Sequence, residues 1–120
     1  MLLRKGSRCL VLFLVVMAVS GEGLAQQPKE FRITASEFFF KPSRIQVPQG
    51  EVRITVTNRG KFLHGLAIVG RDEKIPYIES GETQSLTINF DKPGEVIFYC
   101  PQPGHRNKGM EGKFSVGKTQ

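Results

Sequence analysis

The last quarter of the chain contains one stretch with an unusual set of donor atoms, Tyr99-Cys100-Pro101-Gln102-Pro103-Gly104-His105-Arg106-Asn107-Lys108-Gly109-Met110-Glu111-Gly112. Four residues separate Cys100 from His105, and four more separate His105 from Met110. One short loop therefore carries a thiolate, an imidazole and a thioether. The two prolines and three glycines of this stretch allow tight, restrained turns. The spacing predicts a metal-binding loop.

A fourth donor lies far upstream in the sequence, at His64. Two imidazoles, one thiolate and a weak thioether suit copper that cycles between Cu(II) and Cu(I), because imidazole satisfies the borderline ion and sulfur the softer one. The residues therefore predict one copper ion held by His64, Cys100, His105 and Met110, and an electron carrier as the function. The axial position stays open, since Glu111 or a backbone carbonyl could compete with Met110.

The first 25 residues have the features of an export signal. Three basic residues (Arg4, Lys5 and Arg8) precede an apolar run at 10–19, and Gly23-Leu24-Ala25 has the small-x-small form of a cleavage site. The apolar run has ten residues, whereas about 20 are needed to span a bilayer as a helix. We expect a signal peptide at 1–25 and a periplasmic or otherwise exported domain at 26–120, with no stable membrane span.

Loss of this signal would simplify the inventory of soft ligands. The chain has two Cys, three Met and two His. Because Cys9, Met1 and Met17 lie in the signal, residues 26–120 keep one Cys, one Met and two His, and all four can be placed in one site. Exported proteins usually pair their cysteines, so a lone Cys requires an explanation. Metal ligation supplies one.

Length and charge limit the function classes. Residues 26–120 number 95, enough for one modest core. We expect a monomer. The whole chain carries a formal charge of +6, and residues 26–120 hold 14 basic and 10 acidic side chains, or about +4. This mild excess favours an acidic partner or an anionic membrane surface, although scattered basic residues are often only a solvated face. No basic run interleaved with aromatics is present, which argues against nucleic acid binding.

Apolar residues alternate with polar ones along several short segments. The segment 51–58 is the most regular, with Val52, Ile54 and Val56 on one face. Further strands are expected at 31–36, 44–47, 62–69, 82–90, 96–100 and 112–117. We expect a bulge or a crossing at 37–42 and a loop at 70–81. No segment has a sustained helical period, so the pattern predicts an all-β, antiparallel β-sandwich.

Residues 98–105 and 110–112, with His64 upstream, resemble the cupredoxins, the small type 1 (blue) copper proteins. Residues 40–50 look like the family's early strand pair, so the resemblance covers nearly all of 26–120. It implies a Greek-key sandwich with copper near one end, bound by His64, Cys100 and His105 in a trigonal arrangement and by Met110 more weakly along the axis. The gap from Cys100 to His105 is longer than in plastocyanin and more like azurin or rusticyanin. Such proteins carry electrons between redox partners such as cytochromes or oxidoreductases.

One position departs from the pattern of this family. Many relatives have Asn or Ser directly after the first His ligand, where it ties the two ligand loops together, but this chain has Gly65. Residues around the ligands orient them and tune the metal, so this departure bears on the redox properties of the site. Nearby Asn58 is a candidate to replace the missing side chain.

Two other functions compete with electron transfer. A periplasmic copper carrier or scavenger would usually need exposed Met-rich or His-rich tracts, which the chain lacks. Copper enzymes of similar fold need further histidines for a second copper centre, and a two-copper electron centre needs a second cysteine in the loop. Both histidines are already assigned to the first site. We therefore expect no enzymatic activity.

Overall fold

The computed structural model describes residues 15–16 and 27–118. Apart from Val15 and Val16, the expected signal peptide lies outside the described residues, as does its cleavage site. Within the described part, no helix is long and apolar enough to cross a membrane. The elements are β1 (Lys29–Ser36), β2 (Phe39–Lys41), β3 (Arg44–Val47), β4 (Gly50–Asn58), β5 (His64–Ile68), β6 (Lys74–Ile78), β7 (Thr83–Phe90), β8 (Gly94–Tyr99), the 3-10 turn η1 (Arg106–Lys108) and β9 (Glu111–Val116).

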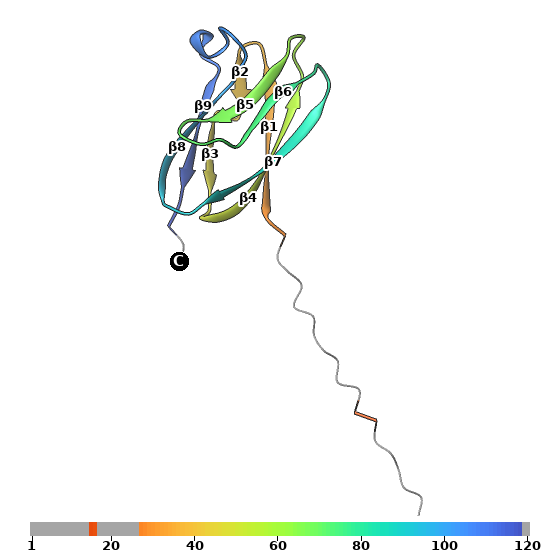
Figure 1. Ribbon diagram of the computed structural model, residues 1–120, viewed down its shortest axis with the longest axis vertical. Coiled ribbons are helices and arrows are strands. Elements are labelled where there is room, and N and C mark those ends of the chain that lie inside the picture. The colour runs from red at the N-terminus through yellow and green to blue at the C-terminus, as the bar shows by residue number, and fades with distance from the viewer. Residues whose placement is uncertain (1–14, 17–26, 119–120) are drawn as a thin grey trace, which may run out of the picture.

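The strands form two sheets packed face to face, which confirms the β-sandwich (Figure 1). One sheet has the strand order β2-β1-β4-β7, and the other has β3-β9-β8-β5-β6. Most pairs are antiparallel, as expected, but β1 with β4 and β3 with β9 are parallel. The parallel β1–β4 pair arises because the chain crosses to the second sheet for β3 and then returns beside β1. The loop that carries η1 lies at the end of the sandwich opposite the C-terminal end of β9 (Figure 1).

The core lies between the two sheets and follows the predicted alternation. Along β4, Val52, Ile54 and Val56 are completely buried, whereas Arg53 is exposed. Burying one such aliphatic side chain contributes roughly 1.5–3 kcal/mol. Phenylalanine rings join the sheets, because Phe98 of β8 packs against Phe40 of β2 with ring centroids 5.2 Å apart. The same face of β8 leads directly to Cys100, which is also buried.

The expected loop at 70–81 is wrong in one respect, because it contains strand β6. This strand lies at the edge of its sheet and pairs with β5 through a shift of register between His64 and Leu66. Ile75 and Ile78 are both buried although they are three positions apart, which does not fit a period of two. The irregular register and the proline at position 76, which an edge strand tolerates, removed the period of two on which the prediction relied.

The aromatic residues of 37–42, where a bulge or a crossing was expected, form a hairpin within one sheet, and the chain crosses to the other sheet only after Lys41, before β3. Ser36 pairs with Phe39, so Glu37 and Phe38 form a two-residue turn between β1 and β2. Phe40 is buried and Phe39 is exposed, and Phe38 is partly buried. This turn carries Glu37 and Phe38 to the neighbourhood of His64 and His105, respectively.

Candidate metal centre

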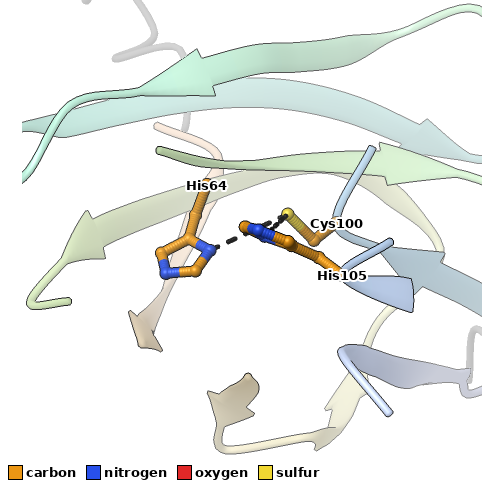
Figure 2. Close-up of side chains that lie close together, drawn as sticks. All are labelled: His64, Cys100 and His105. Atoms are coloured by element: carbon orange, nitrogen blue, oxygen red, sulfur yellow. Dashed lines mark hydrogen bonds between the residues drawn. The ribbon is translucent and has the colours of Figure 1, made fainter. Parts of the chain in front are cut away.

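Three predicted ligands come together from separate parts of the chain. His64 begins β5, Cys100 directly follows β8, and His105 lies in the loop before η1. Figure 2 shows the three side chains pointing toward one another. Cys100 Sγ lies 3.9 Å from Nδ1 of His64 and 3.5 Å from Nδ1 of His105, and the three donor atoms lie within 4.8 Å of one another. His64 and Cys100 are buried, whereas His105 is partly exposed.

The backbone of the loop brings Met110 to the same place. The N–H of Cys100 donates to the carbonyl of Met110 at 3.1 Å, and the N–H of Met110 donates to the carbonyl of His105 at 3.2 Å. The chain can return in this way because Gly109 ends η1 with a φ of 95°, a left-handed conformation that glycine adopts without strain. Met110 is completely buried.

Burial at the site favours the neutral imidazole of His105 and opposes ionisation of the Cys100 thiol. Burial lowers the pKa of His105, and neighbouring His64 and Lys108 lower it further. Neutral imidazole is the form that binds metals. Burial raises the pKa of Cys100, while the backbone N–H groups of Gln102 and Gly65, which bond to its sulfur, act in the opposite direction. These two N–H groups are placed to stabilise the thiolate that a metal requires.

The carboxylate of Glu37 lies against the other side of the His64 ring. Oε1 of Glu37 is 3.3 Å from Nε2 of His64 and also accepts the N–H groups of Lys61, at 2.6 Å, and Phe62, at 2.8 Å. The hydrogen bond from Phe62 is the main cause that lowers the pKa of Glu37 to about 2, and that from Lys61 adds to it. Nothing in the sequence predicts this role of Glu37, because it lies 27 positions from His64 and no local pattern indicates the contact.

Gly65 is required by the strand beside it. A Cβ atom at Gly65 would lie 2.5 Å from the carbonyl oxygen of Ile75 and 2.6 Å from that of Pro76, which are backbone atoms of β6. The connection between β6 and the Cys100 loop comes instead from Gln102, whose side-chain amide donates to Pro76 O at 2.9 Å. The position after His64 is therefore glycine for steric reasons.

The expectation that Asn58 ties the two ligand loops together is wrong. Its side-chain amide donates to the carbonyls of Phe62, at 2.8 Å, and Ile78, at 2.9 Å, and its oxygen accepts the N–H of Gly60 at 2.8 Å. These bonds hold the loop before His64 against the end of β6. They do not extend to the loop of Cys100, because the side-chain donors and acceptor of Asn58 are already engaged.

Replacing Asn58 with alanine is expected to lower the free energy of unfolding of the metal-free protein by roughly 3 kcal/mol, because it leaves buried backbone groups without partners. Urea unfolding measures the change. Thr57→Ala is the control, since it removes only an exposed hydroxyl hydrogen bond to Thr83, and we expect a change within about 0.5 kcal/mol. Equal stabilities for the two variants would contradict this role of Asn58.

The sandwich and its donor set together define a class of protein. One thiol and two imidazoles converge at one end, with the thioether residue Met110 tied beside them, and this set fits a single copper ion. His64, Cys100, His105 and Met110 form a site of the type 1 copper kind. The chain belongs to the Cupredoxin-like domain family, whose model matches residues 8–116.

Comparison with individual proteins agrees with this fold. Subunit 2 of cytochrome c oxidase from Thermus thermophilus is 28% identical over 78 residues, which cover 62% of this chain and 57% of that protein. The chain spans about half the length of the curated relatives it matches. Auracyanin from Roseiflexus castenholzii has a TM-score of 0.65 at 19% identity, over 77% of this chain and 99% of that one. A multicopper oxidase, mgLAC, has a TM-score of 0.63 at 20% identity, over 78% and 40%.

Proposed function

We propose that this chain is a small exported type 1 copper protein that carries single electrons between redox partners. One observation carries the proposal: the one Cys and both His residues of 26–120 place their donor atoms within 4.8 Å of one another. Residues 1–25 would act as a cleaved signal peptide. Mass spectrometry of the exported protein tests cleavage after Ala25.

His64, Cys100 and His105 would bind the copper, and Met110 would provide the weak axial ligand. The bound ion would supply a one-electron Cu(II)/Cu(I) couple. His64, Cys100 and Met110 are held in the core, so these residues have little freedom to rearrange when the charge at the site changes. His105 is the partly exposed member of the set. A partner would therefore approach the site at His105.

An apolar rim lies beside this approach. We define it as Phe38, Phe62 and Leu63. The ring of Phe38 meets the ring of His105 edge-on, with centroids 4.9 Å apart, and Phe62 and Leu63 are 58% and 44% exposed. Nζ of Lys108 lies 4.3 Å from the centroid of Phe38. An apolar surface with a basic edge suits a redox protein, such as a cytochrome or an oxidoreductase, that presents an apolar patch beside acidic groups.

Replacing Leu63 with serine is expected to slow electron self-exchange between reduced and oxidised copies by about tenfold, equivalent to about 1.4 kcal/mol of contact energy. Two copies must bring their rims together to exchange an electron, so loss of apolar contact lowers the rate. Line broadening in NMR spectra of partly oxidised protein measures it. Val69→Ser is the control, because Val69 is 46% exposed but follows the opposite end of β5 from His64. Equal rates in both variants would contradict the rim.

The direct test of the function is spectroscopic. The exported protein is mixed with one equivalent of Cu(II), and its visible absorption and electron paramagnetic resonance spectra are recorded. We expect an intense thiolate-to-copper band and a narrow copper hyperfine splitting, both lost on reduction. A colourless protein, or an ordinary tetragonal Cu(II) signal, would contradict the proposal.

The alternative of a copper carrier is less well supported. His64, Cys100 and Met110 are buried, so an acceptor protein could reach the metal only past His105, and we expect slow copper release. Rapid transfer of copper to a metal-free acceptor would favour the carrier. An oxidase or reductase with a second copper centre would need more histidines than the two in this sequence, so we do not propose enzymatic activity.

A further inference from the structure

Glu37 is an acidic residue placed directly behind a predicted copper ligand. It lies in the turn between β1 and β2, and 24% of its side chain is exposed. Its Oε1 accepts the backbone N–H groups of Lys61 and Phe62, at 2.6 and 2.8 Å, and lies 3.3 Å from Nε2 of His64. Two backbone donors from one loop therefore anchor the carboxylate while it faces the ring.

The loop before His64 is shaped around this carboxylate. A Cβ atom at Gly60 would overlap both oxygens of Glu37, so only glycine at this position leaves room for the group. The N–H of Gly60 is in turn held by the side-chain oxygen of Asn58 at 2.8 Å. Three consecutive residues, 60–62, thus provide space or hydrogen bonds for one carboxylate.

This arrangement determines how the His64 ring can behave. A carboxylate accepts hydrogen bonds and cannot donate them when ionised, so the proton of a neutral imidazole is held on Nε2. The other nitrogen, Nδ1, then keeps its lone pair, and it is the atom that faces Cys100 at 3.9 Å. Hydrogen bonds to the far nitrogen of a ligating histidine fix its tautomer and orientation and raise its basicity.

We propose that Glu37 is a positioning residue of the metal centre, whose carboxylate holds His64 as the Nε2–H tautomer with Nδ1 directed at the copper. This inference rests on the proposed function for the identity of the metal, but the tautomer does not depend on it. The negative charge of Glu37 also favours Cu(II) over Cu(I), because Cu(II) carries the larger positive charge. Glu37 therefore lowers the reduction potential of the site.

The first measurement uses the metal-free, unmodified protein. Long-range proton–nitrogen NMR correlations identify which ring nitrogen of His64 carries the proton, and we expect Nε2. A proton on Nδ1 would overturn the proposal. Because this measurement needs neither copper nor a variant, it separates a failure of the positioning role from a failure of the proposed function, which the Cu(II) spectrum of the unmodified protein would reveal.

The second measurement uses Glu37→Gln, which keeps the shape of the side chain and removes its charge. We expect Cu(II) to bind about 10–100-fold more weakly and the reduction potential to rise. Glu73→Gln is the matched control, since Glu73 pairs with Arg71 at 2.7 Å beyond the opposite end of β5 and loses the same charge. Equal affinities and potentials in the two variants would overturn the proposal.

A third variant displaces the carboxylate without removing its charge. In Gly60→Ala the new Cβ takes the space of the Glu37 oxygens, so we expect weaker Cu(II) binding and a mixture of His64 tautomers. The double variant Gly60→Ala/Glu37→Gln should bind Cu(II) about as weakly as Glu37→Gln alone, because both changes act through one contact. Fully additive losses of Cu(II) affinity would show that Gly60→Ala does not act through the Glu37 carboxylate, and would contradict the proposal that this loop positions it.

Discussion

Replacing Cys100 with alanine is expected to abolish the intense visible band of the copper-loaded protein and to weaken copper binding by roughly a thousandfold, equivalent to about 4 kcal/mol. The band arises from charge donated by the thiolate, and alanine has no donor atom. His64 and His105 remain, so residual Cu(II) should give an ordinary tetragonal signal. Absorption, electron paramagnetic resonance and competition titrations with a chelator measure the three effects.

The matched control for Cys100→Ala is Met110→Leu. Both residues are buried, at 1% and 0% exposure, and leucine nearly conserves the volume of methionine. Because a thioether is only a weak axial ligand in such sites, we expect Met110→Leu to keep the visible band and to raise the reduction potential. A band that survives in Cys100→Ala would exclude Cys100 as the ligand. A potential unchanged in Met110→Leu would exclude Met110 from the axial position.

Restoring the residue that many cupredoxins have after the first histidine is expected to harm this protein. In Gly65→Asn the new Cβ would meet the carbonyl oxygens of Ile75 and Pro76 at 2.5 and 2.6 Å. Because backbone atoms of β6 cannot rotate away, we expect a loss of about 3 kcal/mol in the free energy of unfolding, near the upper end of typical overpacking costs. Chemical unfolding of the metal-free protein measures it.

Two further variants complete the test of Gly65. Gly65→Ala separates the steric effect of Cβ from the polar amide, and we expect it to be almost as destabilising as Gly65→Asn. Gly117→Ala is the control, because its Cβ would meet only Val47 O, at 3.9 Å, and we expect a change within about 0.5 kcal/mol. A Gly65→Asn protein as stable as Gly117→Ala would show that β6 moves aside at little cost.

Much of the fold and of the site could be predicted from the residues themselves. The alternation along 51–58 became β4, with Val52, Ile54 and Val56 completely buried. Alternation is a local property, because successive side chains of a strand point to opposite faces. Chemistry alone grouped the donor residues: soft ligands are few, and only two histidines were available to complete the set.

Contacts across strands could not be predicted in this way. Strand β6 was missed because a register shift against β5 broke the period of two. Asn58 was expected to tie the two ligand loops, but its bonds go to Gly60, Phe62 and Ile78. Such contacts depend on which strands become neighbours, and the residue pattern within one segment does not predict the strand that will pair with it.

The alternating strands and the donor atoms follow from the residues alone, since pleating and ligand chemistry are properties of individual residues and their near neighbours. Tertiary structure decided what surrounds those donors. Only the packing of the β1–β2 turn against the loop before His64 brings the Glu37 carboxylate within 3.3 Å of the ring. Only the approach of β6 to β5 makes glycine necessary at position 65. The first contact depends on how a turn and a loop pack at the end of the sandwich, and the second on which strands are neighbours within one sheet. In both, segments that are distant in the sequence share one small, closely packed volume.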